Sequence, residues 1–285
     1  MRQYLGHLPE KVKTFISQQA YGSRLRSACD QAIEILYPRQ TLDHDPDIIN
    51  FAAPAQNVQA TGLSAGAWSS IRFLSDEGCA MCARPFEGGL YMGPDALCTF
   101  CSQTPFPFRH TRAACLYDEA SRGLILAFKH ADRLDLRPVL LGWLSRAGNE
   151  LLSQADVVVP VPLHPSRLFE RRFNQAAELA RPLARQHKRD YMACALQRVR
   201  PTHKQTSQAR TAKGRMADRM ANVKDAFALS EAGQRRLKGR HVLLIDDVFT
   251  SGATLSACTE ALLKGGVRRV DCLVLARAAT QTAPL

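Results

Sequence analysis

Short runs of aliphatic and β-branched residues alternate with longer amphipathic segments from residue 113 onward. Apolar runs of this length and composition are typical of buried strands in a parallel sheet. We expect strands at 113–118, 156–162, 194–199, 241–248 and 270–276. We expect helices at 119–130, 136–152, 170–188 and 255–264, the last of them stopped by Gly265 and Gly266. This alternation predicts an α/β fold, a parallel sheet with helices on both faces.

The first 110 residues follow a different pattern. Residues 1–40 place apolar side chains at helical spacing, and Pro38 closes that segment. Residues 41–75 are rich in Asp, Asn, Gly, Ser and Pro, which predicts a loop-rich insertion or linker. We therefore expect three parts: a helical extension with this insertion at 1–75, a small cysteine module at 76–110, and the α/β domain at 111–285.

The composition is that of an ordinary globular protein. The 285 residues are 46% hydrophobic and 22% charged, which supplies enough apolar material for a core. No apolar run approaches the roughly 20 residues that a membrane-spanning helix needs. The first residues also lack the apolar segment of a secretory signal. We therefore expect a cytoplasmic protein with no membrane span.

The formal net charge of +12 bears on the kind of partner that the protein binds. Positive charge of this size attracts phosphates, nucleotides or nucleic acid, although a solvated basic surface explains it equally well. The basic residues are concentrated at 181–220, where only Asp190 and Asp218 oppose them. Residues 200–222 also lack an apolar stripe, so we expect a mobile basic loop there.

The segment 241–254 carries the most informative motif. A hydrophobic strand runs into Asp246 and Asp247, and a loop containing hydroxyls and a glycine then leads into a helix. Backbone N–H groups at such a helix N-terminus bind anions, and a glycine lets a phosphate approach the backbone closely. The phosphate-binding candidates are Thr250, Ser251, Gly252, Ala253 and Thr254.

The two acids beside this loop need a partner other than phosphate. Ribose hydroxyls or Mg²⁺ would suit them, and a ribose 5-phosphate ligand satisfies the acids and the loop together. The alternative is a capped helix in a generic α/β domain, with Asp246 and Asp247 as solvated loop acids.

The loop after the strand at 156–162 faces the same edge of the expected sheet, because ligands gather at the carboxyl ends of parallel strands. Its candidates for holding a pyrophosphate are His164, Arg167 and Arg171. Arginines there would neutralise a departing anion, but a surface helix with solvated arginines is an equal alternative. Asn174 and Gln175 are equally well explained as local hydrogen bonders at a helix start.

Two C-x-x-C pairs lie in the cysteine module, Cys79 with Cys82 and Cys98 with Cys101. Their spacing is typical of a closed, four-thiolate structural zinc site. The region is poor in regular structure, so a metal is a sensible source of stability. The alternative is a pair of redox dithiols, but the strand and helix start of a thioredoxin-like motif are lacking.

Taken in order, these motifs resemble those of one family. They are the two C-x-x-C knuckles, Y-D-x-x-x-R-x-L-I-x-x-x-K at 117–129, P-V-P-L-H-x-x-R-x-x-x-R-x-F-N-Q at 160–175, and L-L-I-D-D-V-x-T-S-G-A-T at 243–254. The chain resembles the ComF family, also called the competence protein ComFC group. The last motif by itself is similar to the fingerprint of type I phosphoribosyltransferases, which bind phosphoribosyl pyrophosphate (PRPP).

The resemblance implies a type I phosphoribosyltransferase-like sheet preceded by a zinc-ribbon module. It implies PRPP and Mg²⁺ as ligands, with Asp246 and Asp247 holding the ribose hydroxyls as the catalytic pair and the loop at 250–254 holding the 5′-phosphate. It also implies handling of incoming single-stranded DNA in natural competence, beside other competence proteins. Three features depart from the family. Arg172 stands where a glycine is usual, residues 41–75 separate the first helix from the knuckles, and the basic segment leading to Asn-Val-x-x-Ala-Phe is present only loosely at 198–227.

Three functions remain open on the sequence. The first is an enzyme that transfers a 5-phosphoribosyl group to a nucleophile and releases pyrophosphate. The second is an accessory protein whose basic loop and zinc knuckles contact single-stranded DNA. The third is a regulator that retains the PRPP fold without catalysis.

Overall fold

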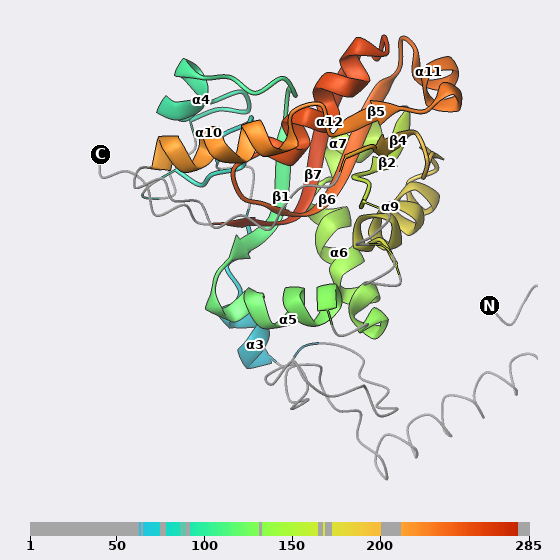
Figure 1. Ribbon diagram of the computed structural model, residues 1–285. Coiled ribbons are helices and arrows are strands. Elements are labelled where there is room, and N and C mark those ends of the chain that lie inside the picture. The colour runs from blue at the N-terminus through green and yellow to red at the C-terminus, as the bar shows by residue number, and fades with distance from the viewer. Residues whose placement is uncertain are drawn as a thin grey trace, which may run out of the picture.

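The computed structural model describes residues 63, 65–74, 78–86, 88, 92–130, 133–164, 168, 173–200 and 212–278. Its centre is a five-stranded sheet in the order β1–β7–β6–β2–β3, with all neighbouring strands parallel (Figure 1). The strands are β1 (Thr111–Tyr117), β2 (Val157–Pro160), β3 (Asp190–Tyr191), β6 (His241–Phe249) and β7 (Arg269–Ala278). The predicted parallel α/β sheet is confirmed.

Helices cover both faces of this sheet because successive side chains of a strand point to opposite sides. Leu243 and Ile245 of β6 enter one apolar core, and Val242 and Leu244 enter the other. The first core is closed by α5 (Glu119–His130), the short 3-10 helix η3 (Leu134–Leu136), α6 (Arg137–Ala147), α7 (Asn149–Gln154) and α9 (Gln175–Gln186). The second is closed by α12 (Ala253–Lys264), α4 (Thr99–Gln103), α11 (Glu231–Leu237) and the antiparallel pair β4 (Leu196–Arg198) and β5 (Phe227–Leu229).

Two expected helices differ in their bounds. The helix expected at 136–152 is split into α6 and α7 at Gly148, where the chain lies against the sheet. A Cβ added at Gly148 would lie only 2.4 Å from a methyl carbon of Leu273. The helix expected at 170–188 begins at Gln175, because the Asn174 side chain caps it by accepting a hydrogen bond from the Ala176 N–H.

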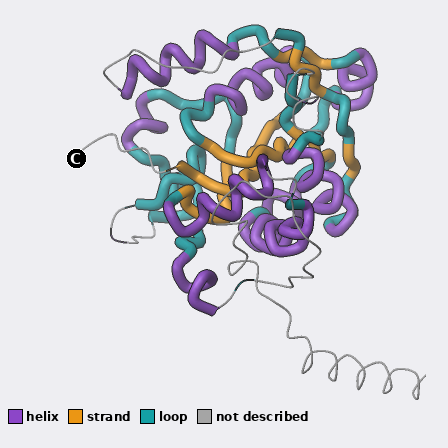
Figure 2. Tube along the Cα trace, turned by 60° about the horizontal axis from the view of Figure 1, so that its bottom comes forward, coloured by secondary structure: helices purple, strands orange, loops and turns teal. Residues whose placement is uncertain are grey.

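The prediction of a loop throughout 200–222 is wrong for its second half. Residues Ala212–Val223 form α10, which packs against α12 (Figure 2). The segment lacks a broad apolar stripe, but its Ala, Met, Lys and Arg residues have high helix propensity, and Val223 is buried at its end. Residues 201–211 lie outside the described part of the chain.

The N-terminal part contributes one short helix and an edge contact. Helix α3 (Ala65–Ser70) lies within the stretch expected to be loop-rich. The following residues pair with the outer edge of β1, where Leu74 N–H donates to Ala114 O and Leu116 N–H donates to Arg72 O. The expected helical extension at 1–40 and most of the insertion at 41–75 lie outside the described residues. In the part that is described, every helix is too short or too polar to cross a membrane.

Candidate functional site

The acid pair lies at the switch point of the sheet. Strands β2 and β6 are neighbours, and the helices that follow them, α9 and α12, cover opposite faces. Ligands of open α/β sheets bind outside the carboxyl ends of two such strands. Asp246 and Asp247 occupy this position at the end of β6, and the register places Ile245 opposite Pro160 of β2.

Backbone amides orient both carboxylates. The Asp247 N–H donates to Asp246 Oδ1 at 2.9 Å, and the Val248 N–H donates to Asp247 Oδ1 at 2.6 Å. Burial, together with the neighbouring charge of Asp247, raises the pKa of Asp246 to about 7. A carboxylate held in this way is ready to bind a hydroxyl or a cation, which would repay its desolvation.

The loop after the acid pair leads into the N-terminus of α12. Gly252 is the N-cap of α12 and has a φ of 80°, a left-handed conformation that favours glycine. The Ser251 hydroxyl accepts a long hydrogen bond of 3.4 Å from the Ala253 N–H. The first amides of α12 have no partner within the helix, and its dipole favours negative charge at this end. Thr250 is exposed and Thr254 is half-buried, so both hydroxyls lie near solvent.

The loop after β2 reaches the same edge of the sheet but is described only in part. The Val161 N–H donates to Ile245 O at 2.9 Å, which continues the pairing of β2 with β6 and brings the following turn to the acid pair's strand. His164 lies in this turn, half-buried. Arg167 and Arg171, the other two pyrophosphate candidates, lie outside the described residues.

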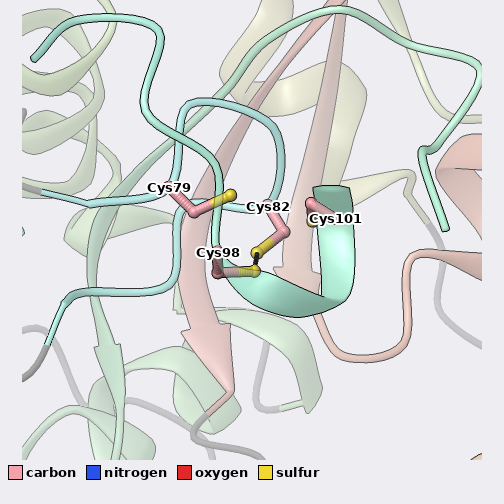
Figure 3. Close-up of side chains that lie close together, drawn as sticks. All are labelled: Cys79, Cys82, Cys98 and Cys101. Atoms are coloured by element: carbon pink, nitrogen blue, oxygen red, sulfur yellow. Dashed lines mark hydrogen bonds between the residues drawn. The ribbon is translucent and has the colours of Figure 1, made fainter. Parts of the chain in front are cut away.

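The four cysteines come together in one buried cluster. Their sulfur atoms all lie within 4.8 Å of one another (Figure 3), with Cys101 on α4 and Cys98 at its N-cap. The Cys82 and Cys98 sulfurs are 3.8 Å apart, far beyond the ~2 Å of a disulfide. That separation equals the edge of a tetrahedron whose metal–sulfur bonds are ~2.3 Å, the value for zinc. The donor set therefore fits a metal ion with four thiolate ligands.

Hydrogen bonds among the four thiols divide their pKa values. The pKa of Cys98 is lowered to about 6 and that of Cys79 far below its usual range, whereas the pKa values of Cys82 and Cys101 are raised well above it. The thiolate is the form that binds metals. All four cysteines are free of disulfides, and their gathering into one cluster, with every sulfur within 4.8 Å of the others, does not fit a pair of separate redox dithiols.

Comparisons with known proteins agree with this architecture. Residues 174–285 match the model of the phosphoribosyl transferase domain. A protein named Competence protein F, from Haemophilus influenzae, is 35% identical over 127 residues, which cover 45% of this chain and 52% of that protein. A protein named DNA utilization protein YhgH, from Escherichia coli, is 30% identical over 185 residues, covering 63% of this chain and 77% of that protein. The chain belongs to the ComF family.

This ComF protein spans about half the length of its Haemophilus relative and about three quarters of the Escherichia one. Among solved structures, the orotate phosphoribosyltransferase from Aeropyrum pernix is 22% identical, over 49% of this chain and 58% of that one, with a TM-score of 0.28. A superposition of that quality says nothing about the site. The phosphoribosyltransferase-like fold of this ComF protein follows from its parallel sheet and the domain match.

Two basic side chains at the site of this ComF protein were missed in the sequence. Lys129 Nζ, at the end of α5, lies 2.5 Å from Asp247 Oδ2. The charge of Arg198, at the end of β4, acts on Asp246. Lys129 closes the Y-D-x-x-x-R-x-L-I-x-x-x-K motif, and that motif was the available signal. Nothing in the local pattern around Arg198 distinguishes it from other surface arginines.

The Asn-Gln pair that follows the β2 loop supports the site rather than forming it. Asn174 caps α9 and donates from its amide to Val161 O at 3.0 Å. Gln175 is buried and donates to the Lys129 backbone oxygen at 2.9 Å. The interpretation as a local helix-start hydrogen bonder is confirmed for Asn174. It does not hold for Gln175, whose side chain instead fixes the backbone of Lys129 at the end of α5.

Proposed function

We propose that this ComF protein binds PRPP, or a closely related ribose 5-phosphate ligand, together with Mg²⁺. Asp246 and Asp247 would hold the ribose hydroxyls, and the amides and hydroxyls of 250–254 would hold the 5′-phosphate. Mg²⁺ prefers carboxylate oxygens and ligand phosphates, and both meet at this edge of the sheet. Lys129 contacts Asp247, His164 lies in the turn after β2, and the charge of Arg198 acts on Asp246. These three side chains would face the pyrophosphate, with Arg167 and Arg171 as further candidates.

One observation carries the proposal. The acid pair lies near the carboxyl end of β6 (His241–Phe249), a few residues before the N-terminus of α12 at Ala253, and α9 and α12 cover opposite faces of the sheet there. A generic capped helix needs no acid pair there, and the raised pKa of Asp246 means that the pair is costly to keep without a ligand.

Phosphoribosyl transfer is the reaction that such a complex would support. The bond from ribose C1 to pyrophosphate breaks, pyrophosphate leaves with the electron pair, and a nucleophile of the acceptor forms the new bond to C1. Cations beside the leaving group lower the barrier by stabilising its developing charge. Among the described residues we identify no general base for the acceptor, so we leave the acceptor's identity unassigned and propose the binding step first.

Calorimetry with PRPP and Mg²⁺ tests this proposal. The wild type should bind, and the double variant Asp246→Asn/Asp247→Asn should lose binding by about a hundredfold or more, since each charge-assisted contact contributes ~1.5–3 kcal/mol. The matched control is Glu260→Gln, an exposed acid on the outer part of α12, which should bind as the wild type does. A wild type that does not bind PRPP would refute the ligand assignment.

We propose zinc as the metal of the cysteine cluster and a purely structural role for it, because four protein ligands leave no open coordination position. The module at 76–110 would then be a zinc ribbon attached to the phosphoribosyltransferase-like domain at 111–285. Free thiols in a closed cluster also suit the reducing cytoplasm.

A role with single-stranded DNA is the second candidate. The relatives are named for competence and for DNA utilization, and the net charge of +12 would attract a nucleic-acid backbone. Fluorescence anisotropy with a labelled oligonucleotide across a salt series tests it. Binding that weakens steeply with salt would support contacts to the DNA phosphates. No binding at low salt would exclude a role with single-stranded DNA. It would also exclude a DNA-binding role in DNA uptake beside other competence proteins.

A further inference from the structure

Arg277 joins the cysteine module to the phosphate loop. It lies near the carboxyl end of β7, and only 4% of its surface is exposed. Its Nε donates to the backbone oxygen of Cys82 at 2.8 Å. One terminal nitrogen donates to the backbone oxygens of Phe249 at 3.1 Å and Thr250 at 2.9 Å, and also to Ala278 O at 2.7 Å. A single buried guanidinium therefore holds a metal-ligand knuckle and the start of the phosphate loop together.

Aromatic contacts connect the same two parts of the chain, the cysteine module and the phosphate loop. The Arg277 guanidinium lies over the ring of Phe249 at 4.5 Å. Phe106 and Phe108, which follow the second cysteine pair, stack on each other at 4.9 Å and meet the Phe249 ring edge-on at 5.8 and 6.1 Å. A Cβ at Gly252 would lie 2.7 Å from Phe106. The wall behind the phosphate loop is thus built from the cysteine module.

The positive charge of Arg277 makes its connection with the cysteine module depend on the metal. A buried cation is costly unless an opposite charge compensates it. Within the described residues, no carboxylate forms an ion pair with Arg277, whereas Cys82, to which it is bonded, belongs to the four-cysteine cluster. Four thiolates around one divalent ion carry a net charge of about −2, because metal binding displaces the thiol protons. Removal of the metal therefore removes the counter-charge as well as the fixed position of the Cys82 carbonyl.

We propose that Arg277 is a positioning residue through which metal binding at the four cysteines holds the backbone of Phe249–Gly252 in its phosphate-binding conformation. The proposal rests on the ribose-phosphate function given above. The cysteine module then has a role beyond its own stability, since a metal-free chain keeps its central sheet but presents a loosened phosphate loop.

Hydrogen–deuterium exchange at residues 249–254 tests the coupling without any ligand, and calorimetry with PRPP and Mg²⁺ tests its consequence. In the zinc-loaded wild type, these amides should be protected, and stripping the zinc with a chelator under reducing conditions should speed their exchange about tenfold or more. Arg277→Met should show the same fast exchange with zinc still bound, and PRPP affinity should fall by a similar factor. Protection of β2 (Val157–Pro160), which is remote from the module, serves as the internal reference.

Two further variants keep the test decisive. Arg277→Lys keeps the charge but cannot span Cys82 and Phe249, so it should also loosen the loop while folding more readily than Arg277→Met. Arg268→Met removes an exposed arginine just before the opposite end of the same strand and should leave the loop protected. Unchanged exchange at 249–254 in the zinc-stripped wild type, or in zinc-loaded Arg277 variants, overturns the proposal. If exchange responds as expected but PRPP does not bind the wild type, the coupling stands and the ligand assignment fails.

Discussion

Lys129 forms an ion pair with Asp247 across the carboxyl edge of the sheet, with 2.5 Å between its Nζ and the carboxylate Oδ2. The two side chains are 23% and 15% exposed, so solvent screens the pair only partly. The buried amide of Gln175 fixes the Lys129 backbone from α9. Three elements, α5, α9 and β6, therefore set the charge beside the candidate ribose site.

Replacement of Lys129 by methionine should weaken PRPP binding. The variant removes the cation that pairs with Asp247, so the two adjacent acids repel the phosphates of the ligand more strongly. We expect the dissociation constant to rise about tenfold or more, the usual cost of a lost charge-assisted contact. Calorimetry with Mg²⁺ present measures this. Lys264→Met, at the exposed far end of α12, is the control, and equal affinity in the two variants would exclude a role for Lys129.

Asp246→Asn should stabilise the ligand-free protein at alkaline pH. The pKa of Asp246 is about 7 in the folded protein, chiefly through burial, against 3.8 for the ordinary group. Between these values the folded state retains a proton that the unfolded chain has lost, so the wild type loses stability as the pH rises from about 4 to 7. The asparagine variant does not lose stability in this pH range, because its side chain does not ionise.

We expect the free energy of unfolding of the variant to exceed that of the wild type by roughly 1–3 kcal/mol at pH 8. This is less than the whole pKa shift would give, because the carboxyl keeps some contact with solvent. The difference should vanish near pH 4. Urea denaturation at both pH values measures it, with Glu260→Gln as a surface control that should follow the wild type. A variant less stable than the wild type at pH 8 would contradict the prediction.

A second charge network lies at the amino-terminal edge of the sheet and should serve stability alone. Asp271 is fully buried; its Oδ2 accepts hydrogen bonds from His241 Nε2 at 2.8 Å and from Arg269 at 2.7 Å. Burial alone would raise the pKa of Asp271, but the hydrogen bonds from His241 and Arg269 outweigh it and hold the pKa below its usual value. Asp271→Asn should therefore cost about 3–5 kcal/mol of unfolding free energy, because it takes away the carboxylate that pairs with the partly buried Arg269 and the buried His241.

The pH dependence of this network has the opposite sign to that of Asp246. An acid whose pKa is lower in the folded state than in the unfolded chain stabilises the fold fully at any pH above its unfolded-state pKa. This stabilisation is lost as the pH falls through its folded-state pKa. The stabilisation by Asp271 should therefore persist at neutral pH and disappear only below about pH 4. Thermal melts from pH 3 to 7 measure this. Asp95→Asn, an exposed acid that contacts His110, should change stability by no more than ~0.5 kcal/mol.

The purified protein should carry about one zinc ion per chain at the four-cysteine cluster. Cys101→Ser removes a fully buried ligand and should abolish zinc binding, lower the melting temperature and expose the module to proteolysis. Metal analysis and calorimetric melting measure these effects. Cys194→Ser changes an exposed cysteine outside the cluster and should retain the zinc. Full zinc content in Cys101→Ser would show that the four thiols do not form one site.

Local patterns predicted most elements because contiguous residues encode them. The strands β1, β2, β6 and β7 and the helices α5 and α12 lie close to their expected bounds. Helix α10 was missed because its sequence lacks a broad apolar stripe, and helix propensity with a contact to α12 outweighed that lack. The break at Gly148 also escaped prediction, since it depends on the close approach of the sheet at Leu273.

Short motifs of neighbouring residues are enough to identify the acid pair before a glycine-containing helix start, the spacing of the four cysteines, and the family. Tertiary packing, by contrast, sets the pairing of Lys129 with Asp247, the contact by which Gln175 holds Lys129 in place, and the connection of Cys82 with Phe249 through Arg277. Those contacts join elements far apart in the chain, and their partners are set by how helices and strands pack, which no local pattern records.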